Sequence, residues 1–191
     1  TECCRKINKI VEYMNWEDEC YLLSKRKFRE NANIINVFSK NRGKVSGVVY
    51  GGNSRKIKNY LQISNKLYIN HNAKNENRLG YFKTELVKPI SPLYFNDKER
   101  SSALLSISSI LNMLLPDSQP NQNIYKSFEE FVNSIKLDNW VILYIFLELS
   151  LIKDLGYDPN LEKFKNIKSE TDFQKIKIDT FTYDAPLYLI Q

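Results

Sequence analysis

The sequence predicts an α+β protein in which a small β-barrel precedes a group of helices. Up to Pro92, short runs of β-branched and aromatic residues alternate with turn residues. Beyond Pro92 the apolar residues recur with the spacing of an α-helix. The charge divides at the same place. Residues 14–92 carry 15 Lys and Arg against 6 Asp and Glu, a balance of +9, whereas residues 93–191 carry 10 against 14, a balance of −4. These three observations predict two parts with different tasks.

Five short segments in the first part carry the strand pattern. They are the runs 20–24, 34–38, 44–50, 61–69 and 79–87. Turn signals separate them, chiefly Asn41-Arg42-Gly43, Gly51–Ser54 and the polar segment 70–77. Pro89 and Pro92 end the pattern, because proline cannot donate to a sheet ladder. Five such strands in roughly 75 residues suit a small closed barrel, and the five-stranded OB-fold is the barrel of this size that binds nucleic acid.

Three helices are expected after Pro92. Asp97 opens the first, which Pro116 closes, and a second amphipathic stripe covers 124–135. Asp138 is placed to N-cap the third, which ends at Gly156. The expected limits are 1–13 for an extension that is non-native or disordered, 14–92 for the OB-fold domain, 93–160 for a helical domain and 161–191 for an irregular tail.

Composition narrows the class of protein further. With 191 residues, 42% apolar and 26% charged, the chain can bury a core and resembles a soluble globular protein. We expect no membrane span, since no apolar run reaches the ~18 to 20 residues required, and no signal peptide. The three cysteines have no metal-binding spacing and fit a reduced, cytoplasmic setting.

The stretch 41–60, NRGKVSGVVYGGNSRKIKNY, is the centre of the functional prediction. A strand that ends in two glycines and continues into a basic loop presents positive charge beside bare backbone, which suits a phosphodiester chain. We expect contacts through the loops 25–29, 40–44 and 55–58. The predicted DNA-binding residues are Lys25, Arg26, Lys27, Arg29, Lys40, Arg42, Lys44, Arg55, Lys56 and Lys58. The alternative is a solvated surface in a lysine-rich protein.

Aromatic residues near these cations are candidates for stacking on unpaired bases, a contact that contributes about 1 to 3 kcal/mol per base. They are Phe28, Tyr50, Tyr60, Tyr68 and Tyr81. The alternative is a place in the barrel core. We expect the core for Phe28 and Tyr50, and the choice stays open for Tyr60.

No pattern of an enzyme is evident, so we expect no catalytic residues, no metal-binding residues and no cofactor. His71, the one histidine, lies in a polar segment and is expected at the surface. Gly51-Gly52 lacks the Lys-Ser/Thr of a phosphate-binding loop. The acidic run Glu17-Asp18-Glu19 is expected to be a solvated strand entry.

The same segments resemble the family of the bacterial recombination mediator RecO. The resemblance covers roughly residues 16–161 in one order of elements. It rests on YLLSKRKFREN, IINVFSKNRGKVSGVVYGG, SRKIK, LGYFKTELVKP and YIFLELSLIKDLGYDPNL, with GKVSGVVYGGNSRK the most specific. It implies an N-terminal OB domain and a helical C-terminal domain. It also implies binding of single- and double-stranded DNA, and annealing of complementary strands coated by single-strand-binding protein (SSB).

The resemblance further implies partnership with RecR, indirect help to the recombinase RecA and a nucleoid-associated location. In the helical part it implies an apolar groove for the acidic C-terminal tail of SSB. The cations available to rim that groove are Lys98, Arg100, Lys126, Lys136 and Lys153. Many relatives carry a four-cysteine zinc module after the last helix. Residues 160–191 contain no cysteine, so zinc is not carried over.

These observations predict a non-enzymatic mediator that binds and anneals DNA. Two alternatives from other classes stay open at this point. An OB-fold RNA-binding protein acting in translation would prefer structured RNA. A non-catalytic protein-interaction scaffold, whose basic half binds an acidic protein, would not retain oligonucleotides at physiological salt.

Overall fold

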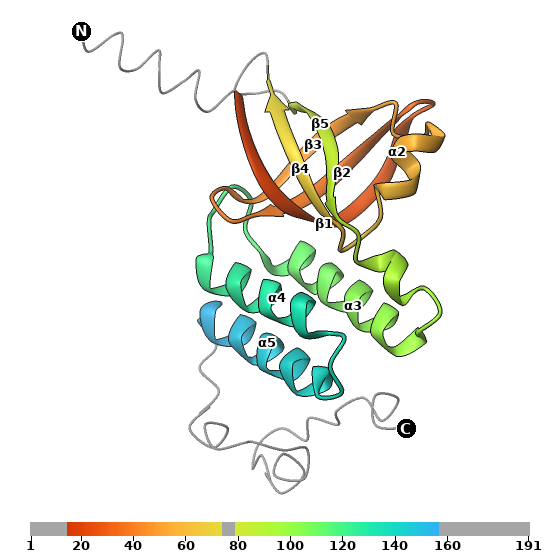
Figure 1. Cartoon of the computed structure of the whole chain (residues 1–191). Coiled ribbons are helices and arrows are strands. Elements are labelled where there is room, and N and C mark those ends of the chain that lie inside the picture. The colour runs from red at the N-terminus through yellow and green to blue at the C-terminus, as the bar shows by residue number, and fades with distance from the viewer. Residues whose placement is uncertain (1–14, 74–78, 157–191) are drawn as a thin grey trace, which may run out of the picture. The chain divides into compact units, whose positions relative to one another are not determined.

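The computed structural model describes residues 15–73 and 79–156 (Figure 1). The first elements are the strands β1 (Asn15–Arg29), β2 (Ala32–Ser39) and β3 (Gly43–Tyr50), the short helix α2 (Arg55–Tyr60), and the strands β4 (Lys66–Asn72) and β5 (Tyr81–Lys88). The 3-10 turn η1 (Ser91–Tyr94) leads to the helices α3 (Lys98–Leu114), α4 (Gln122–Ser134) and α5 (Trp140–Asp154). The predicted order, strands first and helices after, is confirmed.

The five strands close into a barrel in the order β1-β2-β3-β5-β4. Strand β1 reaches two neighbours because it is long: residues 15–21 pair with β4 and residues 20–29 pair with β2, both antiparallel. The barrel closes where β3 meets β5 in parallel, at Val48 and Tyr81. This connectivity, with a helix between β3 and β4, is that of the OB-fold. The predicted fold class is therefore confirmed.

Alternate strand residues fill the barrel. The buried cluster comprises Cys20, Leu22, Ile35, Val37, Val49, Leu61, Leu67, Ile69 and Phe82. Gly47, in the middle of β3, lies directly against the Phe82 ring, and a Cβ at this position would approach the ring to 2.5 Å. The glycine therefore leaves the room that the ring needs inside the barrel.

Helix α3 belongs to the same compact unit as the barrel. The side chain of Asp97 caps its N-terminus by accepting from the Arg100 N–H at 3.0 Å, as the sequence predicts. Farther along, the Ser108 hydroxyl lies 2.9 Å from that of Ser64, in the turn before β4. The sequence-based limits 14–92 and 93–160 place this helix with the second part, and those limits stay predictions.

Helices α4 and α5 fall in a second compact unit. The apolar stripe of α4 includes the buried Phe128 and Phe131, and the Phe131 ring meets that of Tyr144 of α5 edge-on at 5.6 Å. The predicted N-cap of α5 is wrong. Asn139, and not Asp138, holds that position, and its side chain makes no capping hydrogen bond.

Three local predictions in the barrel are wrong as well. The basic loop expected at 25–29 is the second half of β1, and the loop expected at 55–58 is helix α2. The strand expected from Leu61 begins only at Lys66, after a turn in which Ser64 has a φ of 69°. Closing the barrel requires a long β1 and a helix between β3 and β4, and these tertiary demands override local propensity.

His71 is a further residue of the barrel whose predicted position is wrong. Strand β4 runs through this residue, so the imidazole is 8% exposed instead of lying in a surface loop. Its ring stacks on Trp16 at 4.9 Å and lies 5.4 Å from the Phe82 ring. The first residues of the polar segment 70–77 therefore belong to strand β4, and His71 among them is buried. The predictions for 1–13, 74–77 and 161–191 fall outside the described residues.

Candidate nucleic-acid interface

The strand register places two arginines of β1 on the outer face of the barrel. Since Ile35 and Val49 point into the core, the alternate residues of β2 and β3 point outward. Arg26 stands opposite Ile34 on β2, and Arg29 stands opposite Ala32. The two rows continue across β3 to Val48 and Tyr50, and from Val48 to Tyr81 on β5. These rows form one side of four strands, on which Ala32, Ile34 and Val48 are buried as a small apolar cluster.

A bulge at Phe28 gives β1 two consecutive side chains on this outer face. The register passes from Lys27 opposite Asn33 directly to Arg29 opposite Ala32, so Phe28 is an extra residue. The guanidinium of Arg29 lies 5.2 Å from the centre of the Phe28 ring. The expected core position of Phe28 is wrong, because its side chain is 46% exposed.

Tyr50, the last residue of β3, is also misplaced by the sequence prediction. It was expected in the core but is 61% exposed, since its position in β3 is an outward one. Its ring lies 6.4 Å from that of Tyr81 on β5, with 57° between the ring planes. A depression of about 400 Å³ lies beside it. The lining residues are Arg29, Glu30, Asn31, Ala32, Tyr50 and Gly51. We call this the Tyr50 site.

Helix α2 presents a second group of cations. The Ser54 hydroxyl caps the helix by accepting from the Ile57 N–H, and Ile57 packs against the barrel core. This orientation leaves Arg55, Lys56 and Lys58 exposed. Among the described residues, no carboxylate forms an ion pair with any of these three.

Lys25 joins the helix to β1. Its Nζ donates to the carbonyl oxygen of Leu61, just after α2, at 2.7 Å. Partial burial lowers the pKa of Lys25, and the nearby positive charge of Lys58 lowers it further. Four of the predicted cations therefore gather here, and we call them the α2 group: Lys25, Arg55, Lys56 and Lys58. Tyr60 at the end of the helix is an anchor, since its hydroxyl donates to the Thr84 carbonyl at 2.7 Å.

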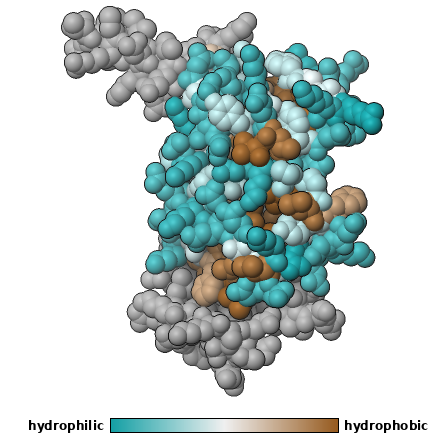
Figure 2. Space-filling view, in the orientation of Figure 1, coloured by the Kyte–Doolittle hydropathy of each residue, from teal (hydrophilic) through white to brown (hydrophobic). Residues whose placement is uncertain are grey.

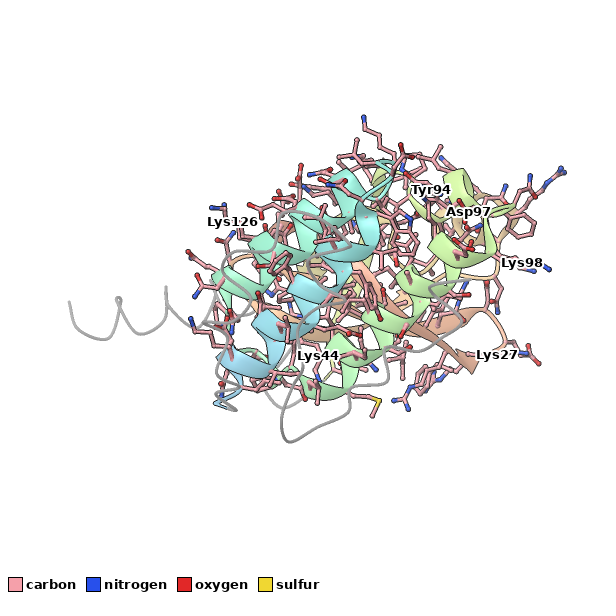
Figure 3. All side chains as sticks on the ribbon, turned by 90° about the horizontal axis from the view of Figure 1, so that it is seen from below. Lys27, Lys44, Tyr94, Asp97, Lys98 and Lys126 are labelled. Atoms are coloured by element: carbon pink, nitrogen blue, oxygen red, sulfur yellow. The ribbon has the colours of Figure 1, made fainter. Side chains whose placement is uncertain are left out.

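Three of the remaining predicted cations, Lys40, Arg42 and Lys44, lie in or next to the β2–β3 turn. Lys40 and Arg42 lie in the β2–β3 turn, at the opposite end of these strands from Arg29, and the Arg42 guanidinium lies 5.6 Å from the Trp16 ring. Lys44 is 12% exposed and turned inward. Its Nζ donates to the Asn112 carbonyl at 3.0 Å and pairs with Asp117 at 3.2 Å. Figure 3 shows Lys44 beside α3 and Lys27 at the edge of the barrel.

Helix α3 covers part of the outer face of β2 and β3. Asn112 accepts a hydrogen bond from the Asn36 amide at 2.7 Å, and Asn36 in turn accepts from the Ser46 hydroxyl at 2.8 Å. These contacts close the outer face at the end near the β2–β3 turn. Toward the other end, Ala32, Ile34 and Val48 are also buried, at 2%, 8% and 6% exposed, and Tyr50 is the exposed residue beyond them.

Sequence reasoning also missed a cation. Lys83 on β5 is exposed two residues beyond Tyr81, and its outward direction follows from Phe82 pointing inward. The sequence alone does not show that Lys83 points outward, because that requires knowing that Phe82 points into the core. In the view of Figure 2, hydrophilic residues cover most of the barrel surface. Among the described residues, no set of His, Cys, Asp and Glu is arranged to hold a metal ion.

Comparison with known families decides which barrel protein this is. The model for "Recombination protein O N terminal" matches residues 14–90, and that for "Recombination protein O C terminal" matches residues 96–172. The chain belongs to the RecO family. The N-terminal RecO match spans all five strands, and the C-terminal match begins just before α3. The resemblance inferred from the sequence is confirmed.

Individual RecO relatives agree with this assignment. The DNA repair protein RecO of a Wolbachia strain from Drosophila simulans is 36% identical over 152 residues. Those of Roseobacter denitrificans and Ehrlichia chaffeensis are 32% and 30% identical over 150 and 152 residues. Each alignment covers 78% of this chain and 62% of the relative. The chain thus spans less than two thirds of the length of these RecO relatives. In the part of the chain that the structure describes, no helix is long and apolar enough to cross a membrane.

Proposed function

We propose that this chain is a non-enzymatic mediator of DNA repair and recombination that binds single- and double-stranded DNA through its OB barrel. Its relatives are named DNA repair proteins. The observation that carries the proposal is the α2 group. Three exposed cations on one short helix, without carboxylate partners among the described residues, form a surface suited to phosphates.

The binding mode follows from the chemistry of these side chains. Lysine and arginine that contact phosphates release condensed counterions, so binding is independent of sequence and weakens steeply with salt. The Tyr50 site, with Arg26 and Arg29, lies on the outer face of the sheet, whereas the α2 group lies on the helix between β3 and β4. A barrel with cations in two places can neutralise phosphates on two strands at once. Their mutual repulsion then falls, which favours annealing of complementary strands.

The finer parts of the proposal concern partners. They are annealing of SSB-coated strands, contact with RecR, capture of the SSB tail by the helical part and indirect help to RecA. Lys98, Lys126, Lys136 and Lys153 are exposed and available for an acidic tail. Arg100 is less so, because its guanidinium pairs with Asp97 at 2.6 Å.

A charge-reversal experiment tests DNA binding. The variant Arg55→Glu, Lys56→Glu, Lys58→Glu is titrated into labelled single-stranded DNA across a salt series and followed by fluorescence anisotropy. We expect weaker binding and a fall of about 2 in the slope of log affinity against log salt, since each phosphate contact on a single strand contributes roughly 0.7. Annealing of complementary strands should slow in parallel.

A net-charge-matched control separates local contacts from overall charge. The variant Lys126→Glu, Lys136→Glu, Lys153→Glu changes the charge equally but on α4, α5 and the segment between them. It should keep the affinity and slope of the wild type. An unchanged affinity and slope in the α2 variant would contradict the proposal. Preference for structured RNA would instead support the RNA-binding alternative, and failure to retain any oligonucleotide would support the scaffold.

A further inference from the structure

We propose that the Tyr50 site is a stacking subsite for one unpaired nucleobase. This inference rests on the proposed DNA binding and specifies which state of DNA this end of the barrel takes. The base would lie on the exposed face of the Tyr50 ring, and the adjoining phosphate would lie toward Arg29. The α2 group, in contrast, offers charge without an exposed aromatic ring.

The first support is the arrangement of the aromatic rings. A single exposed tyrosine is ordinary on a protein surface, but Tyr50 is 61% exposed beside an open depression and has the Tyr81 ring 6.4 Å away. The Tyr81 ring limits the directions that the Tyr50 ring can take. Gly51 follows with a φ of 70° and contributes no side chain to the depression. The exposed Tyr50 ring therefore borders a depression that Gly51 leaves open on one part of its lining.

The second support is the charge distribution around the depression. Arg29, the last residue of β1, and Glu30, in the β1–β2 connection, both line it. A phosphate is attracted by Arg29 and repelled by Glu30, so a phosphate alone is a poor occupant of the whole space. A nucleotide suits both residues, because a carboxylate accepts hydrogen bonds from the amino groups of bases while a guanidinium binds the phosphate.

The third support is size and reach. A volume of about 400 Å³ lies within the range of roughly 300 to 1,000 Å³ found for small-ligand sites. Because α3 closes the other end of the outer face through Asn112 and Asn36, the sheet has little room for a long run of stacked bases. A base in a duplex already has both faces stacked, so this site accepts only a base that is unpaired.

Paired variants and paired probes test the inference. The probes are a labelled thymidine oligomer of about 15 nucleotides, within the site sizes of OB-folds, and an abasic oligomer with the same number of phosphates. We expect Tyr50→Ala to weaken binding of the thymidine oligomer by about 5- to 100-fold. Its affinity for the abasic oligomer and its salt slope should equal those of the wild type. Tyr50→Phe keeps the ring and should keep the affinity.

Phe95→Ala is the matched control, since it removes an aromatic side chain that is 84% exposed just after η1 and does not line the Tyr50 site. It should leave both affinities unchanged. Equal loss on both oligomers in Tyr50→Ala, or no loss on either, would overturn the stacking subsite. Wild-type protein that binds both oligomers equally, with a steep salt slope, would also overturn it yet leave the proposed DNA binding standing. Binding to neither oligomer would overturn both.

Discussion

The α2 group and the Tyr50 site differ in the kind of contact that the proposed function assigns to them on one barrel. The α2 group consists of three cations on a short helix and Lys25 of β1, with Tyr60 turned inward as an anchor. The Tyr50 site combines Arg29 of β1 with the exposed Tyr50 ring beside a depression. The first can recognise only charge, whereas the second can recognise the flat face of a base. Charge density alone therefore does not distinguish a surface that binds backbone from one that binds bases.

The largest effect is expected when both regions are changed together. Adding Tyr50→Ala to the triple reversal on α2 should weaken single-strand binding by the product of the two separate losses. The backbones of the two regions are linked through Ser54, whose N–H donates to the Gly51 carbonyl at 2.8 Å. The four substituted side chains share no hydrogen bond or ion pair with one another among the described residues, so their free energies should add within about 0.5 kcal/mol. On duplex DNA only the α2 reversal should matter. Strong non-additivity in the same anisotropy titration would show that the two regions form one site.

A smaller effect is expected at the boundary between the Tyr50 site and α3. Asn112→Ala removes the acceptor for the amide of Asn36, which is partly buried. The loss of this hydrogen bond should lower the free energy of unfolding by about 1 to 3 kcal/mol in a urea titration. Affinity for the abasic oligomer should not change, since no residue of the α2 group contacts this helix position. Ser109→Ala, on the exposed face of α3, is the control and should leave stability nearly unchanged.

The smallest effect concerns Lys25 and pH. Burial and Lys58 lower the pKa of this ammonium in the folded protein, so the unfolded chain binds more protons between the lowered pKa and the usual 10.5. The free energy of unfolding should therefore rise with pH in that window, and this contribution is lost as pH falls through the lowered pKa. Lys25→Met should flatten the rise. If the free energy of unfolding rises with pH equally steeply in the wild type and in the variant, groups other than Lys25 cause the rise.

The same comparison shows which residues of the predicted site are exposed, while their contact with DNA stays a prediction. The ten predicted cations are found by composition and position alone, and eight of them are exposed. Lys44 is held inward by Asn112 and Asp117, which lie far away in sequence. Phe28 and Tyr50 were named as candidates for stacking but expected in the core, because the bulge in β1 and the phase of β3 are unknown from the sequence.

By itself the sequence determined the α+β class, the five-stranded barrel, the family and the concentration of positive charge before Pro92. These properties depend on periodicity, turn residues and composition, which are local. Only the tertiary structure decided which face each residue takes. In the structure Phe28 is a bulge in β1, and His71 is buried against Trp16 and Phe82. The segment predicted as a basic loop at 55–58 is helix α2. A shift of one residue in a strand exchanges core for surface, and that phase is set by partners distant in the chain.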